Sequence, residues 1–141
     1  PQAAVDLVKE FEGCRLQAYL DPVGIPTIGY GLTTGALPGV VVQMGMTITQ
    51  READEYLEHT LARFADQIWP AFSRYPKPHQ FGAMVSLAYN IGTGAFKAST
   101  ALRRFNAGDT FTLTWGDDGV CGFACERRDH DGPFLWEEKA R

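Results

Sequence analysis

The sequence is poor in cysteine and histidine, with three of each among 141 residues. Three cysteines are too few for a disulfide framework, and an odd number leaves at least one thiol unpaired in a monomer. Neither residue type shows a paired CxxC or HExxH spacing, so no metal site is expected, and no other cofactor is implied. A disulfide among Cys14, Cys121 and Cys125 stays open as the alternative to inert buried thiols.

Positive charge is also scarce. The 13 basic and 17 acidic residues give a net charge of −4 and a pI near 5.3, which argues against a protein that binds nucleic acid by neutralising its phosphates. Residues 1–70 hold four basic and nine acidic side chains, whereas residues 71–108 hold five basic and no acidic ones. That basic stretch predicts a local face that attracts an anionic ligand.

No hydrophobic run is suited to crossing a membrane. Residues 22–50 lack charged side chains over 29 positions, but six glycines and three prolines interrupt them too often for a transmembrane helix. The N-terminus shows no basic segment followed by an apolar run and a cleavage site. We expect no membrane span in this chain, and its sequence predicts no cellular location.

What is present is the composition of an ordinary globular protein, 45% hydrophobic and 21% charged. The length suits one domain, which we expect to be a monomer. Helical spacing of apolar residues, capping residues and terminal glycines predict helices over residues 2–11, 50–68, 79–91 and 99–106.

A small glycine-rich sheet is predicted between the first two helices. The run Asp21-Pro22-Val23-Gly24 is typical of a type I turn, and indicates a hairpin. Pro26 and Gly29 suggest that the returning strand is bulged or lies at an edge. We expect the sheet to extend to about Thr47, and the segment from Thr110 onward to form short helices and loops.

Two acidic residues near the N-terminus are a candidate catalytic pair. Glycosidic bond hydrolysis needs one protonated carboxyl group to donate to the leaving oxygen and one ionised carboxylate. Glu12 suits the acid role, because the negative end of a helix and apolar neighbours raise the pKa of its carboxyl group. Asp21, in an exposed turn, is expected to stay ionised, and Thr27 to hold a water beside it. Spacing alone equally fits a surface glutamate, a turn aspartate and a strand threonine.

A family resemblance favours the catalytic interpretation. The runs Phe11-Glu12-Gly13-Cys14-Arg15-Leu16, Ala18-Tyr19, Asp21 and Pro26-Thr27-Ile28-Gly29-Tyr30-Gly31 resemble the E-G-x-R-x-x-A-Y-x-D and T-I-G-Y-G signature of phage-type lysozymes. Further matches include Ile48–Ala53, Gln80–Ser86, Tyr89–Gly92 and Ser99–Gly108. The resemblance covers residues 4–108 well and the rest poorly.

The resemblance implies a two-lobed α+β lysozyme-like fold with a cleft between the lobes. Residues 13–49 would form the β lobe, 50–68 the linking helix, and 71–141 with 1–12 the helical lobe. The implied reaction is hydrolysis, with inversion, of the β-1,4 bond between N-acetylmuramic acid and N-acetylglucosamine in peptidoglycan. Such an enzyme acts on the cell wall, in the periplasm or host envelope, and its partner is the glycan strand.

The same resemblance implies the site residues. Glu12, Asp21 and Thr27 match the family's catalytic residues, and Tyr30 and Asn90 are candidates for substrate binding. Arg127 and Arg128 are further candidates, because the family's tail arginine faces the catalytic glutamate.

The sequence departs from the family pattern in three places. Leu32 stands where a histidine is common, the tail motif at Gly122–Arg128 is one residue longer, and Asp131 replaces a usual glutamate. Two alternatives therefore stay open: a catalytically silent glycan-binding module on the same scaffold, and a lytic transglycosylase.

Overall fold

In the computed structural model, the first helix and the first hairpin form where the sequence predicts them. The structure describes residues 2–108, 110–115, 120–126 and 133–139, and the side chains of residues 2–10 and 12–108. Helix α1 (Gln2–Phe11) is followed by strands β1 (Arg15–Leu20) and β2 (Pro26–Gly29). The backbone N–H of Gly24 donates to the carbonyl of Asp21 at 2.9 Å, which closes the predicted turn.

The first sheet is shorter than predicted, and the strand predicted to be bulged or at an edge is its central strand. Strand β3 (Leu32–Thr33) ends the antiparallel order β1-β2-β3, beyond which an isolated bridge joins Gln17 to Thr47. Pro26 does not prevent β2 from being the central strand, because it is the first residue of the strand, where a missing N–H is tolerated. The irregular pairing is in β1, between Arg15 and Tyr19.

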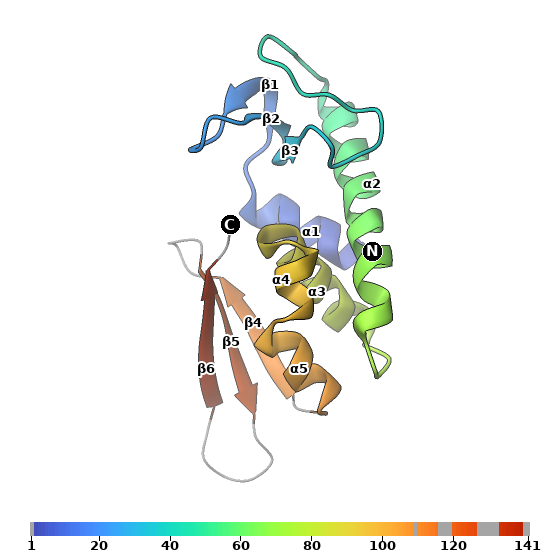
Figure 1. Ribbon diagram of the computed structural model, residues 1–141, viewed down its shortest axis with the longest axis vertical. Coiled ribbons are helices and arrows are strands. Elements are labelled where there is room, and N and C mark those ends of the chain that lie inside the picture. The colour runs from blue at the N-terminus through green and yellow to red at the C-terminus, as the bar shows by residue number, and fades with distance from the viewer. Residues whose placement is uncertain (1, 109, 116–119, 127–132, 140–141) are drawn as a thin grey trace.

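Helix α2 (Gln50–Ile68) confirms the continuous helix predicted over residues 50–68. The Thr49 hydroxyl accepts from the N–H of Glu52, and the Glu52 carboxylate accepts from the N–H of Thr49, each at 3.1 Å. This capping box satisfies two N–H groups at the helix start. The helix runs from beside the sheet to the far end of the helical region (Figure 1), where the 3₁₀ turn η1 (Trp69–Ala71) ends it.

Three shorter helices complete this region. Helices α3 (Pro78–Ile91) and α5 (Thr100–Asn106) match predictions, whereas α4 (Thr93–Lys97) lies in a segment with no predicted element. Gly92, at φ +91°, is the residue between α3 and α4, and glycine adopts this backbone conformation without strain. A continuous buried core joins these helices to the inner face of the first sheet, with Phe96, Ile28 and Leu61 among its largest members.

The predicted short helices and loops of the tail are wrong. Strands β4 (Thr110–Trp115), β5 (Val120–Glu126) and β6 (Pro133–Lys139) form a second antiparallel sheet in the order β4-β5-β6. In β4, threonines alternate with Phe111, Leu113 and Trp115, which is a period-2 pattern typical of a strand. Helices and small antiparallel sheets together confirm the α+β class (Figure 1).

Candidate active site

A cleft of about 750 Å³ lies where the first sheet, α1, α2 and α3 meet. Its walls come from five parts of the chain: the end of α1, the β1–β2 hairpin, the segment from Tyr30 to Ala36, α2 and α3. The residues lining it are Glu12, Asp21, Pro22, Val23, Ile25, Tyr30, Gly31, Leu32, Thr33, Gly35, Ala36, Thr60, Arg63, Phe64, Gln67, Tyr89 and Asn90. The two predicted catalytic carboxyl groups therefore border one cavity.

Glu12 is placed in the cleft by the last turn of α1. Its N–H donates to the carbonyl of Val8 at 2.7 Å, so the helical hydrogen bonding extends through this residue. The side chain is half-buried, and this desolvation raises the pKa of its carboxyl group above the ordinary value of 4.5. Within the described residues, the carboxyl group makes no hydrogen bond or ion pair. Such a group is suited to carry a proton into a reaction.

Asp21 is held by the turn that it begins. One oxygen, Oδ1, accepts from the N–H of Val23 at 2.9 Å and from the N–H of Ile25 at 2.8 Å. The Asp21 N–H also donates to the carbonyl of Ile25 at 3.0 Å, which fixes the backbone. Two donors on one oxygen set the orientation of the carboxylate. Oδ2 accepts no hydrogen bond within the described residues.

Thr27 lies close to Asp21 in the hairpin but does not line the cleft. Its side chain is only 4% exposed, and its hydroxyl donates to the carbonyl of Ile25 at 2.9 Å. The threonine thus supports the same Ile25 whose N–H binds the Asp21 carboxylate. To share a water with Asp21, the hydroxyl would have to accept a hydrogen bond from it.

Tyr30 and Asn90 both line the cleft, with their polar groups engaged. The Tyr30 hydroxyl donates to Asp54 Oδ1 and accepts from Gln50 Nε2, each at 3.1 Å, so it is turned towards α2. The side-chain amide of Asn90 donates to the carbonyl of Ser86 at 3.2 Å. Arg127, Arg128 and Asp131 lie outside the described residues, as do the side chains of Cys121 and Cys125. Cys14 is a free thiol.

One wall of the cleft comes from residues that were not predicted. Thr60, Arg63, Phe64 and Gln67 recur at helical spacing along α2 and all face the cavity. Arg63 also donates to the carbonyl of Ala36 at 3.2 Å, which joins α2 to the segment after β3. This helical spacing could have predicted the cleft wall from the sequence, because it marks a second face of the helix beside the buried one.

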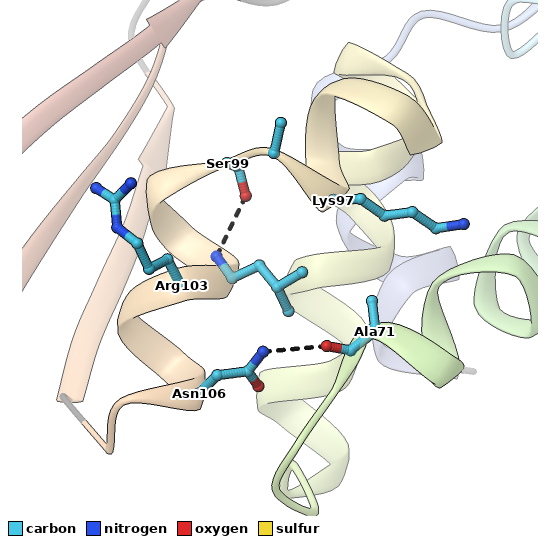
Figure 2. Close-up of a pocket in the computed structure, with 7 residues that line it drawn as sticks. Ala71, Lys97, Ser99, Arg103 and Asn106 are labelled. Carbon is cyan, nitrogen blue, oxygen red and sulfur yellow. Dashed lines mark hydrogen bonds between the residues drawn. The ribbon is translucent and has the colours of Figure 1, made fainter.

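None of the five cations of residues 71–108 lines this cleft, whose basic residue is Arg63. Lys97 and Arg103 instead border a separate hollow of about 350 Å³. Figure 2 shows their charged ends pointing away from each other. In the same hollow the Ser99 hydroxyl accepts from the N–H of Leu102, and the Asn106 amide donates to the carbonyl of Ala71. The hollow thus offers no converging polar groups, and the cleft is the better candidate site.

The cleft brings the carboxyl groups of Glu12 and Asp21 into one cavity. In the part of the chain that is described, no group of three or more histidine, cysteine or acidic side chains is placed to hold a metal ion. None of the described helices is long and apolar enough to cross a membrane. The paired Glu12 and Asp21, in unlike surroundings, are suited to general acid catalysis beside a stabilising negative charge.

The sequence is similar to those of known proteins. Residues 9–115 match the phage lysozyme family. The chain is 43% identical over 113 residues to the endolysin of Salmonella phage P22, an alignment that covers 75% of this chain and 76% of that protein. It is 37% identical over 114 residues to the endolysin of Bacillus phage PZA, covering 77% of this chain but only 41% of that longer protein.

Solved structures agree. An endolysin from Escherichia coli phage FAHEc1 superposes with a TM-score of 0.68 at 41% identity, covering 77% of this chain and 67% of that one. The muramidase domain of SpmX from Asticaccaulis excentricus superposes with a TM-score of 0.66 at 36% identity, covering 77% and 69%. With its two carboxyl groups in a shared cleft, the chain thus belongs to the phage lysozyme family and is a glycoside hydrolase of the lysozyme type.

Proposed function

We propose that this protein hydrolyses the β-1,4 bond between N-acetylmuramic acid and N-acetylglucosamine in peptidoglycan, with inversion at the anomeric carbon, and that it serves bacterial cell-wall lysis. The observation that carries the proposal is the pair of carboxyl groups in one cleft, Glu12 with a raised pKa and Asp21 with two backbone donors. The endolysins and the muramidase domain among its relatives support the same substrate.

Glu12 acts as the general acid in this proposal. Its raised pKa keeps a larger fraction of the carboxyl group protonated near neutral pH than an exposed glutamate would have. The proton passes to the glycosidic oxygen as the bond to the anomeric carbon breaks, so that the leaving sugar departs as an alcohol. Glu12 is left as a carboxylate and regains a proton from solvent.

Asp21 supplies the negative charge on the other side of the reaction. Its free Oδ2 can accept a proton from the attacking water, while the carboxylate stabilises the oxocarbenium-like transition state. Thr27 steadies the hairpin through Ile25 and is proposed to contact that water through its hydroxyl oxygen. Tyr30, Asn90 and the tail residues Arg127 and Arg128 are proposed to help bind the glycan.

Product analysis tests the reaction. Purified peptidoglycan is digested, the muropeptides are identified by mass spectrometry, and the first anomer formed from a soluble oligosaccharide is followed by NMR. Reducing-end muramic acid that appears first as the α-anomer is the expected result, because inversion of a β bond gives α. A 1,6-anhydromuramic product would identify a lytic transglycosylase. Binding without cleavage would identify the silent glycan-binding module.

A further inference from the structure

A cluster of polar side chains beside the cleft connects the part of the chain that carries Glu12 with the part that carries Asp21. It consists of Lys9 from α1, Gln50 and Asp54 from α2, and Tyr30 from the link between β2 and β3. We call these four residues the junction cluster. Each of the three structural elements contributes at least one side chain, and the ion pair between Lys9 and Asp54 crosses directly from one helix to the other.

Asp54 is the centre of the junction cluster. Its Oδ1 accepts from Gln50 Nε2 at 3.0 Å, from the Tyr30 hydroxyl at 3.1 Å, and faces Lys9 Nζ at 3.2 Å. Gln50 Nε2 also donates to the Tyr30 hydroxyl at 3.1 Å, and Lys9 Nζ lies 6.0 Å from the centre of the Tyr30 ring. Three donors that converge on one oxygen define the relative position of their elements better than a single surface ion pair can.

The protonation states of the junction cluster are fixed at working pH. Burial and the hydrogen bond to Asp54 raise the pKa of Tyr30 to about 12, so its hydroxyl remains a donor. The hydrogen bond from Gln50, with the Lys9 and Tyr30 contacts, lowers the pKa of Asp54 below its ordinary value of 3.8. Asp54 is therefore an anion near neutral pH, and its Oδ1 can accept from all three neighbours.

The junction cluster is close in the chain to both catalytic groups. Lys9 is three residues before Glu12, one helical turn away, and the N–H of Glu12 still donates into that turn at Val8. Tyr30 follows β2, which is paired with the strand that leads into Asp21. The backbone carbonyl of Tyr30 also accepts a hydrogen bond from the Tyr89 hydroxyl of α3. Displacing any member would move one side of the cleft relative to the other.

We infer that Lys9, Asp54 and Tyr30 are positioning residues, which set the location of the Glu12 carboxyl group relative to Asp21 and the substrate. The inference rests on the proposed function only in taking Glu12 as the acid. Partly exposed ion pairs contribute little to stability, whereas a misplacement of about 1 Å at a reacting group can cost about 10²-fold in rate. The junction cluster should therefore matter much more to kcat than to folding.

Substitutions that remove charge or hydroxyl but keep size test the inference. We expect Lys9→Met and Asp54→Asn each to lower kcat on a soluble oligosaccharide by about tenfold or more, with KM within about twofold and little change in Tm. Tyr30→Phe, which keeps the ring that lines the cleft and removes only the hydroxyl bound to Asp54, should lower kcat in the same way. Lys9→Arg should restore most of the rate. The Lys9→Met/Asp54→Asn double variant should have nearly the same kcat as the less active of the two single variants, because the two residues act through one contact.

A matched control exists on the same helix. Arg51 and Glu55 form an ion pair at 3.1 Å within α2, on an exposed surface that does not reach α1. Arg51→Met and Glu55→Gln should leave kcat unchanged. A looser junction cluster should also let water reach Glu12, which lowers its pKa, so the alkaline limb of the pH–rate profile should move to lower pH in Tyr30→Phe, which changes no charge, and not in the controls.

The outcomes separate this inference from the proposed function. Wild-type kcat in Lys9→Met and Asp54→Asn would overturn the positioning role, as would losses that are additive or that appear only in KM or Tm. If Glu12→Gln kept near-full activity, the assignment of the acid would be wrong instead. An inactive Glu12→Gln together with fully active cluster variants would leave the proposed function standing and remove the positioning role alone.

Discussion

At the scale of single residues, the site depends on giving two like carboxyl groups unlike surroundings. Glu12 is half-buried at a helix end and makes no hydrogen bond within the described residues, whereas two backbone N–H groups fix the carboxylate of Asp21. Desolvation favours the neutral form of the Glu12 carboxyl group, whereas the two donors fix the orientation of Asp21, so each group suits the role proposed for it. The two groups should therefore respond differently when their charge is removed.

Glu12→Gln removes the proton donor while keeping size and polarity. We expect kcat for glycan hydrolysis to fall by at least about 10²–10⁴-fold with glycan binding retained, because general acid catalysis typically contributes that much. Asp21→Asn should cause a comparable or somewhat smaller loss. Initial rates and binding isotherms on one soluble oligosaccharide measure both, and circular dichroism confirms folding.

Glu12→Gln should also raise the free energy of unfolding, by an amount that depends on pH. Burial raises the pKa of Glu12 in the folded state, so the wild-type protein loses stability as pH rises from the ordinary value of 4.5 through the folded pKa. Glu12→Gln escapes this loss. Its free energy of unfolding should equal that of the wild type near pH 4 and exceed it at pH 7, as urea titrations at the two pH values can measure. A constant difference at both would contradict the raised pKa.

At the scale of elements, α1 reaches the cleft because it packs closely against α3. A Cβ added to Gly82 of α3 would lie 2.5 Å from the Cβ of Ala3 and 3.1 Å from the backbone nitrogen of Ala4. Real Cβ atoms do not approach so closely, so only glycine at this position lets the two helices lie at their observed distance. The placement of Glu12 therefore depends on a residue in another helix.

Gly82→Ala should push α1 away from α3. We expect a loss of about 1–3 kcal/mol in the free energy of unfolding, the usual cost of overpacking, with a fall in kcat because α1 carries Glu12. Chemical denaturation and oligosaccharide kinetics measure the two effects. Gly94→Ala in α4 is the matched control: a Cβ there meets nothing within 4 Å, and the activity should not change.

Local signals in the sequence predicted the elements well where tertiary contacts were not needed. The hydrogen bonds of the capping box at Thr49 and of the turn at Asp21 join residues three positions apart, so both features could be predicted from the local sequence. The prediction of short helices and loops for the tail is wrong because the alternation of threonines with apolar residues in β4 favours a strand. The direction of the Tyr30 hydroxyl was not predictable, since its partner Asp54 is 24 residues away on another element.

At the scale of the whole molecule, charge and cleft are separated. The protein carries −4 overall, yet residues 71–108 carry five positive charges and none of them lines the cleft. Lys97 and Arg103 diverge on the surface around a second hollow (Figure 2). Such charges act at a distance, on the approach of an anionic wall rather than on the bond being broken.

Activity on intact cell walls should accordingly fall as salt rises, because screening shortens the range of attraction. The double substitution Lys97→Glu/Arg103→Glu should weaken this salt dependence and raise KM several-fold with kcat retained. Turbidity assays at 20 and 200 mM salt would measure it, with an uncharged oligosaccharide as the control substrate, whose hydrolysis should be insensitive to both changes. An unaltered salt dependence in the double variant would count against long-range attraction by these cations.

Helix α2 contributes residues both to the junction cluster and to the cleft wall, and this restricts the insertions and deletions that the helix can accept. Gln50 and Asp54 near its start hold the junction cluster, while Thr60, Arg63, Phe64 and Gln67 further along wall the cleft. One inserted residue between them would turn the second set by about 100° about the helix axis relative to the first. No side-chain adjustment restores that rotational phase, so an insertion or deletion of one residue between the two sets should disrupt either the junction cluster or the cleft wall.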